Sequence, residues 1–166
     1  MGYIARDENF FVGEKIVSLR KCGEPCFTYT DFPCYVSQTF NVIKTSRIDQ
    51  LYLTGFFNSR IVRFWLRHKG KMQGHNFQID KEPLLAIPIF APSPADQKRV
   101  ADLVKRIIEC HSKIAKAKTS SELDQFSRLA SQWDSEIQAT IEAHYDLSKE
   151  EVKMLSGQVA DEGMSS

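Results

Sequence analysis

The sequence predicts an α+β fold, in which a mixed small β-sheet module with a basic helix (residues 1–92) is followed by an antiparallel helical hairpin (93–156). Three observations support this prediction. Short segments rich in β-branched and aromatic residues fill the start of the chain. The apolar spacing becomes helical at Asp49. Two long amphipathic stretches, separated by a short polar break, occupy the second part. The length of 166 residues is enough for one domain with a real core.

The first β-rich segments lie at 14–19, 26–30 and 34–44. Their composition favours strands, and residues that form turns separate them. These separating residues are Gly23, Pro25, Asp31 and Pro33. We therefore expect three short strands before the first helix.

A single helix is expected from Asp49 to His68, where apolar residues recur at helical spacing and a glycine soon follows. Residues 70–76 are then expected to form a loop. A second short β section is predicted at 77–79 and 84–90, with prolines limiting its strands to edges or ends.

The helical hairpin has clear start signals. Ser93 can cap the first helix, and Pro94 suits its first position. The polar break at 119–121 caps the second helix, with the acid Asp124 in its first turn. Each helix should be roughly 35 Å long at 1.5 Å per residue. Their apolar seams can cover one another or pair between chains, so a homodimer through the hairpin stays open.

The end of the chain carries a capping box at 148–151, which predicts a short helix. Residues 157–166 have too little apolar content to fold and are predicted to be a disordered tail. Asp146, Glu151 and Lys153 have a weak similarity to the acids and lysine of metal-dependent nucleases. Such nuclease sites place the acids on adjacent strands, whereas this Glu and Lys belong to the predicted helix.

Several classes of function lack their sequence signals. There is no Gly-rich phosphate loop, no GxSxG and no HExxH. The cysteines form no CxxC pair and have no histidine at zinc-finger spacing, which favours reduced thiols in a cytoplasmic protein. They are Cys22, Cys26, Cys34 and Cys110. No apolar run reaches membrane-span length. We therefore expect no cofactor, no metal site, no membrane partner and no enzymatic activity of the chain itself.

Positive charge is concentrated in one part of a nearly neutral chain. Residues 43–81 hold eight basic and two acidic residues, which gives +6, while the whole chain has a net charge of +1. On a helix at about 100° per residue, four of these cations fall within roughly 80° of one another. They are Arg60, Arg63, Arg67 and Lys71. No acid lies at i+4 on this face to pair with them, so phosphates are candidate partners. A solvated helix face is the alternative.

Polar residues around this helix extend the candidate surface. The segment after the helix adds Lys69, Gln73, His75, Asn76 and Gln78. Asn and Gln side chains can recognise adenine edges, and lysines can contact phosphates. Arg20 and Lys21 follow the first predicted strand and either join this surface or form a polar turn. The residues alone leave nucleic-acid binding and a protein interface equally open.

The order of the motifs resembles the TaqI-like C-terminal specificity domain of DNA adenine methyltransferases and fused type II restriction-modification enzymes. The target recognition domains of type I restriction specificity subunits are related to it. The resemblance covers about residues 9–155, and the order of its weak motifs is more specific than any one of them. The matching segments are Asn58-Ser59, Gln78-Ile79 with Lys81, Ile87-Pro88-Ile89, Ala95-Asp96-Gln97-Lys98 and, in degenerate form, Ile141-Glu142 with His144-Tyr145-Asp146-Leu147.

This resemblance implies a module that reads a few base pairs of duplex DNA, and a hairpin spacer that docks it to a catalytic methyltransferase or endonuclease region. The family's catalytic motif, Asn/Asp-Pro-Pro-Tyr/Phe, is absent, as is an S-adenosylmethionine loop. The chain is then expected to be a non-catalytic specificity domain, either a fragment or a separate subunit. A protein–protein interaction module that uses the basic face and the hairpin is the alternative.

The DNA contacts follow from chemistry rather than from the family, because the base-reading surface varies between specificities. Five cations are expected to contact phosphates: Arg60, Arg63, Arg67, Lys69 and Lys71. Five further residues are candidates for base edges: Arg20, Lys21, His75, Asn76 and Gln78.

Overall fold

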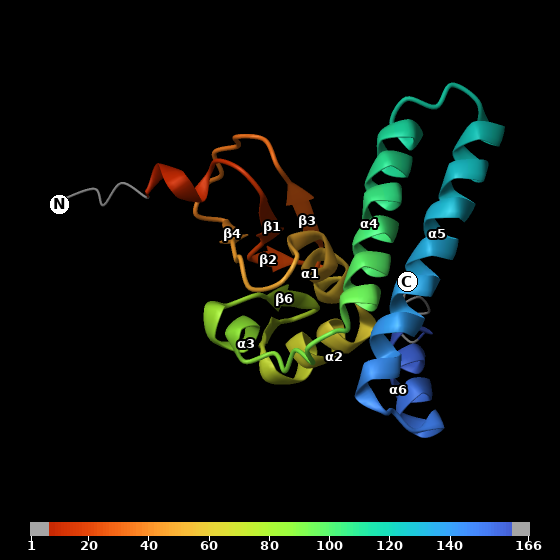
Figure 1. Cartoon of the computed structure of the whole chain (residues 1–166). Coiled ribbons are helices and arrows are strands. Elements are labelled where there is room, and N and C mark those ends of the chain that lie inside the picture. The colour runs from red at the N-terminus through yellow and green to blue at the C-terminus, as the bar shows by residue number, and fades with distance from the viewer. Residues whose placement is uncertain (1–6, 161–166) are drawn as a thin grey trace.

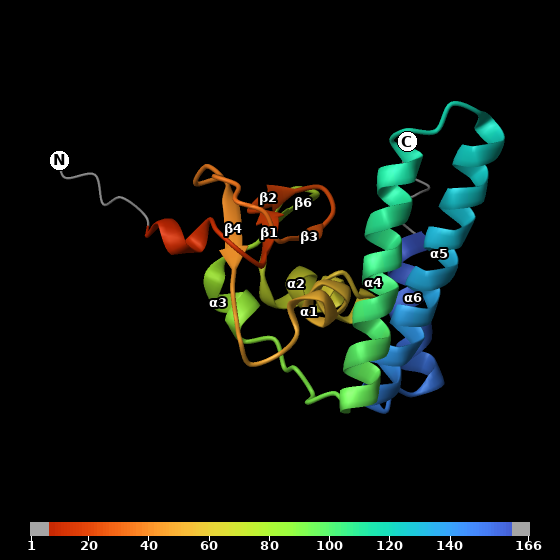
Figure 2. The ribbon, with the colours of Figure 1, turned by 45° about the horizontal axis from the view of Figure 1, so that its top comes forward.

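The structure is a computed structural model that describes residues 7–160, with side chains described to residue 155. Two small sheets and three short helices form a module, and two long helices form a hairpin beside it (Figure 1). The far end of the hairpin projects beyond the module in both views (Figures 1 and 2). The fold is α+β, as the sequence predicts.

The first sheet is antiparallel, with strand order β3-β1-β4. Its strands are β1 (Lys15–Leu19), β3 (Phe27–Thr30) and β4 (Phe40–Ile43). β1 and β3 confirm the strands predicted at 14–19 and 26–30. Only the last part of the predicted segment 34–44 forms a strand. In the central strand, Ile16 is fully buried and lies opposite Tyr29 and Ile43.

The second sheet is antiparallel, with strand order β2-β6-β5. Its strands are β2 (Lys21–Cys22), β5 (Lys71–Gln73) and β6 (Asn76–Gln78). The loop predicted at 70–76 is therefore wrong, because β5 and β6 form a tight hairpin. Gly74 allows its turn by taking a positive φ of 63°. β2 was not predicted as a strand, since two residues carry no periodicity.

The single helix predicted over 49–68 is also wrong. Two helices occupy this range, α1 (Gln50–Phe57) and α2 (Arg60–Lys69). Asn58 ends α1, and the buried Ser59 caps α2 by accepting a hydrogen bond from the Val62 amide. Both residues have side chains that hydrogen-bond backbone groups, so the chain can turn while the apolar spacing continues.

The β section predicted over 84–90 is wrong as well. A short helix, α3 (Lys81–Leu85), begins this segment, and extended chain without strand pairing follows it to Ser93. Pro83 is compatible with the first turn of a helix, where its missing N–H has no intrahelical partner to bond. Ile87 is buried, so the apolar run contacts the core without joining a sheet.

The hairpin is confirmed by α4 (Pro94–Ile114) and α5 (Ser120–Glu142), which run antiparallel (Figure 1). Ser93 caps α4, as predicted. The capping acid of α5 is Glu122 rather than Asp124, because Thr119 is the cap residue and Glu122 lies three positions after it. Hydrogen bonds from backbone amides to the Glu122 carboxylate lower its pKa.

A short 3-10 helix (Ala143–Tyr145) and α6 (Lys149–Ala160) complete the described chain. The capping box that opens α6 is confirmed, since the side chains of Ser148 and Glu151 each accept a hydrogen bond from the other's amide. The predicted disordered tail began at residue 157, but α6 continues to Ala160. Residues 161–166 lie outside the described residues.

α1 forms the centre of the molecule, and every one of its residues is buried. It lies between the first sheet and α4 (Figure 2). Gly55 permits this close approach, because a Cβ at its position would lie only 2.8 Å from Val100 Cγ1. In residues 7–160, no helix combines the length and apolar character that a membrane span requires.

Candidate nucleic-acid interface

The second sheet presents a polar face to solvent. Lys21 and Lys71 lie opposite Gln78 on its two sides, so the three residues form a row across the sheet. Residues paired across strands share a face, and the neighbouring row carries the buried Phe77 on the opposite face. Lys21 and Lys71 are exposed, and 75% of the Lys71 side chain is accessible.

Amide side chains continue this face along the β5–β6 hairpin. Gln73 and Asn76 pair across its turn and are both exposed. The Gln73 side-chain amide donates to Gln78 Oε1 at 2.6 Å. His75 is exposed in the turn itself. We call Lys21, Lys71, Gln73, Asn76 and Gln78 the polar sheet face.

Asp80 organises one end of the polar sheet face. Its carboxylate lies 3.5 Å from an Arg20 guanidinium nitrogen and 3.8 Å from Lys71 Nζ. The Gln78 side-chain amide also donates to it, at 3.0 and 3.2 Å. Only 14% of the Asp80 side chain is accessible, so its carboxylate is held close to these neighbours and offsets part of the positive charge of Arg20 and Lys71. The sequence analysis missed Asp80, which lies between β6 and α3 and meets Arg20 and Lys71 only through the fold.

Arg67 and Lys69 lie in the last turn of α2, immediately before β5. Lys69 is exposed and Arg67 is partly exposed. These two residues therefore continue the cationic surface toward the polar sheet face. Together, the structure places eight of the ten predicted site residues on or beside the second sheet: Arg20, Lys21, Arg67, Lys69, Lys71, His75, Asn76 and Gln78.

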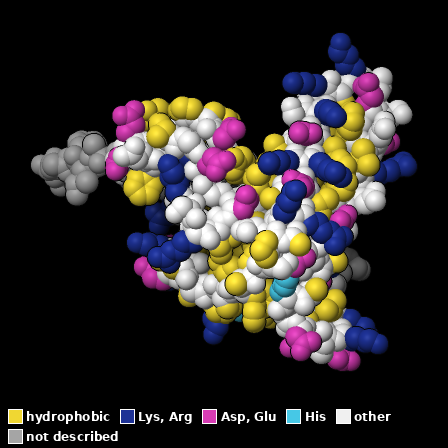
Figure 3. Space-filling model, in the orientation of Figure 1, with side chains coloured by type: hydrophobic (Ala, Val, Ile, Leu, Met, Phe, Trp, Pro, Cys, Tyr) yellow, Lys and Arg dark blue, Asp and Glu magenta, His cyan; other side chains and the backbone are white. Residues whose placement is uncertain are grey.

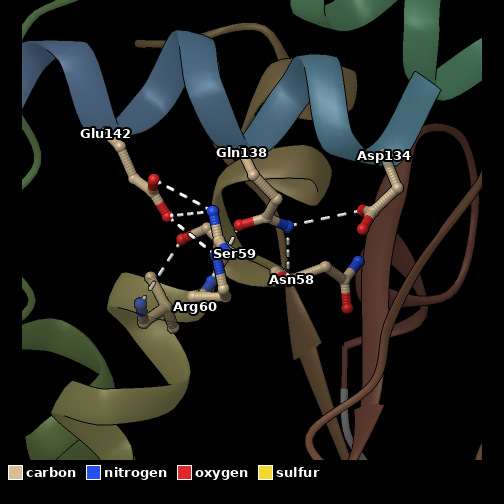
Figure 4. Close-up of polar contacts among 7 residues, drawn as sticks. Asn58, Ser59, Arg60, Asp134, Gln138 and Glu142 are labelled. Carbon is tan, nitrogen blue, oxygen red and sulfur yellow. Dashed lines mark hydrogen bonds and ion pairs between the residues drawn. The ribbon is translucent and has the colours of Figure 1, made fainter. Parts of the chain in front are cut away.

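Arg60 lies elsewhere, at the junction between the module and the hairpin (Figure 4). Its guanidinium donates to the Glu142 carboxylate through Nε at 2.9 Å and a terminal nitrogen at 3.0 Å. Its backbone amide donates to Gln138 Oε1 at 2.9 Å. Such a two-pronged contact fixes the side chain against α5. We therefore leave Arg60 out of the candidate interface.

Arg63 is also engaged by an acid, because its guanidinium pairs with Glu24. The basic helix was expected to lack acidic partners, since none lies at i+4 in its own sequence. For Arg60, Arg63 and Lys71 that expectation is wrong, because the partners come from α5, from the loop before β3 and from Asp80. Sequence spacing within a helix cannot reveal partners that tertiary folding supplies.

Two of the three residues considered for a nuclease site, Asp146 and Glu151, have structural roles. Asp146 takes a left-handed conformation, with φ of 48° and ψ of 42°, at the end of the 3-10 helix. Glu151 accepts a hydrogen bond from the Ser148 amide at 2.8 Å, which lowers the pKa of its carboxyl. Within residues 7–160, no cluster of three metal-ligating side chains occurs.

Comparison with known proteins assigns this chain to no family. No protein-family model matches the chain, and no curated protein matches it.

Proposed function

We propose that this chain is a non-catalytic DNA target-recognition domain of a restriction-modification or DNA adenine methyltransferase system. The observation that carries the proposal is the row Lys21–Gln78–Lys71, which presents two exposed cations and an amide on one sheet face. Phosphate contacts from such cations supply affinity, and amides beside them can read base edges.

The shape of the β5–β6 hairpin suits this role. A two-stranded β-ribbon fits the major groove of B-form DNA, which is about 12 Å wide. The exposed tip of the hairpin carries Gln73, His75 and Asn76, so these side chains would meet base edges first. Lys21, Lys69 and Lys71 would then lie toward the phosphates on either side.

The hairpin of α4 and α5 would dock the module to a catalytic methyltransferase or endonuclease region. The Arg60–Glu142 contact supports this division of roles, because it holds the module against α5 without using the polar sheet face. A DNA partner of this kind also implies a cytoplasmic location.

A salt series of binding to random-sequence duplex DNA tests the proposal, followed by selection of preferred sites from the same pool. Each phosphate contact contributes about −0.9 to the log–log slope, so three to five contacts predict about −3 to −5. Lys21→Ala and Lys71→Ala should each make the slope shallower by about 0.9. Lys153→Ala, an exposed lysine on α6, is the matched control and should leave it unchanged.

The outcomes separate the candidate functions. Salt-dependent DNA binding together with enrichment of a short DNA sequence motif supports a target-recognition domain. Salt-dependent binding without an enriched motif indicates a protein that binds the DNA backbone and needs its catalytic partner to read sequence. Absence of binding at low salt rejects the proposal and favours the protein–protein interaction module instead.

A further inference from the structure

A largely apolar groove of about 830 Å³ separates the first sheet from the hairpin. Figure 3 shows this hollow between the two parts, with hydrophobic side chains along its walls. One wall is β3 with the end of α1, and the other is formed by α4 and α5. The α4 wall contributes Val104, Ile107, Ile108 and Ile114. Ile108 is 38% exposed, which is high for an isoleucine facing another element.

The β3 wall is an open sheet edge. Among the strands of residues 7–160, β3 pairs only with β1, so its other side faces the groove. Phe27 shows how that edge accepts a partner, because its amide donates to Asn58 Oδ1 at 2.9 Å and its carbonyl accepts from Asn58 Nδ2 at 2.7 Å. The Asn58 side chain thus makes the two hydrogen bonds that a neighbouring strand would make.

Strand alternation directs the backbone groups of Tyr29 to the same side as those of Phe27. Among the described residues, no hydrogen bond satisfies the Tyr29 amide or carbonyl at this edge. An unpaired edge above an apolar wall is the arrangement that an added strand completes. The occupant must therefore present backbone donors and acceptors, as an extended peptide does.

The negative charge of the groove places a second requirement on its occupant. Asp134 lies on the α5 wall beside Asn58 (Figure 4) and is exposed. The Gln138 side-chain amide is its neighbour at 3.4 Å, and no cation of the described residues pairs with it. A basic residue on the occupant would complement this end of the groove.

We propose that this groove binds an extended peptide segment of a partner protein as an additional strand on β3. Apolar side chains at alternate positions of the peptide would contact Ile107 and Ile108, and a basic side chain would reach Asp134. The peptide's backbone would pair with Tyr29. This site is separate from the polar sheet face and does not depend on DNA binding.

Selection from a phage-displayed library of random octapeptides, against the full chain, tests this inference. Enriched sequences should alternate apolar residues and carry a lysine or arginine. A synthetic copy of the best sequence should bind, and N-methylation of its alternate backbone amides should weaken binding at least tenfold. An ordinary apolar contact would not respond to backbone methylation in this way.

Two variants locate the site on the protein. Ile108→Glu should weaken peptide binding at least tenfold, whereas Leu123→Glu, at an exposed apolar position on α5 outside the groove, should not. Asp134→Asn should remove the preference for a basic residue. Absence of enriched peptides, or equal binding by Ile108→Glu and the unmodified chain, overturns the inference. DNA binding by Ile108→Glu should be unchanged, so failure here is distinguishable from failure of the proposed function.

Discussion

The guanidinium of Arg60 and the carboxylate of Glu142 form a two-pronged ion pair across 82 residues of sequence. Gln138, one helical turn before Glu142, accepts a hydrogen bond from the Arg60 amide and contacts the Asn58 carbonyl at 3.4 Å. One face of α5 therefore holds both sides of the break between α1 and α2 (Figure 4). This junction gives the basic helix a structural function that is separate from ligand binding.

Arg60→Ala should reduce the stability of the protein without weakening DNA binding. The Arg60 side chain is 35% exposed, so we expect the free energy of unfolding to fall by only about 1 kcal/mol. Urea unfolding of Arg60→Ala, Glu142→Gln and the double variant measures the coupling between the two residues. If Arg60→Ala binds DNA much more weakly while remaining folded, Arg60 belongs to the interface after all.

Asn58→Ala should destabilise the protein more than Arg60→Ala does. The Asn58 side chain makes hydrogen bonds to the Phe27 amide, the Phe27 carbonyl and the Thr54 carbonyl. Their loss should lower the free energy of unfolding by about 2 kcal/mol. Asn58→Asp keeps the acceptor for the Phe27 amide but loses both donated bonds, so it should also be less stable than the unmodified chain. Equal stability of Asn58→Ala and the unmodified chain would contradict this role.

If the β5–β6 hairpin reads bases, removing one of its amide side chains should change DNA sequence preference rather than protein stability. Asn76→Ala should relax sequence preference while leaving the salt dependence of binding unchanged, because an uncharged amide releases no counterions. A good amide–adenine contact contributes about 1–3 kcal/mol of discrimination, so the preference at one base pair should fall by about 5- to 150-fold. Site selection with Asn76→Ala and with Lys71→Ala compares the loss of an amide, which should change the selected motif, with the loss of a cation, which should not. An unchanged motif in Asn76→Ala would exclude this residue as a base reader.

The sequence was sufficient to predict the elements whose signals are local. The cap at Ser93 and the capping box at Ser148 each depend on residues within one turn, and both form as expected. The long helices of the hairpin also follow from their own periodicity. These features need no information about the rest of the chain.

The wrong sequence predictions concern segments whose structure depends on contacts with residues distant in sequence. The break at Asn58 and Ser59 is stabilised by β3 and α5, which are distant in sequence. β2 exists because Lys21 and Cys22 meet β6. In the candidate interface, residue types predicted which side chains could bind DNA. That Arg60 lies at α5, away from the polar sheet face, follows only from the fold.

Raising the pH should destabilise the protein partly through Tyr29. Burial raises the pKa of its hydroxyl, and a hydrogen bond to Glu14 together with the nearby Asp31 and Asp49 carboxylates raises it further. The unfolded chain ionises at the ordinary tyrosine pKa of about 10, while the folded protein keeps the proton. Stability from this group is therefore complete below pH 10 and is lost as the pH rises above it. Tyr29→Phe should make urea stability fall less steeply over this range. An identical slope in Tyr29→Phe, or tyrosinate absorbance showing ionisation of Tyr29 at its ordinary pKa in the folded protein, would contradict the assignment.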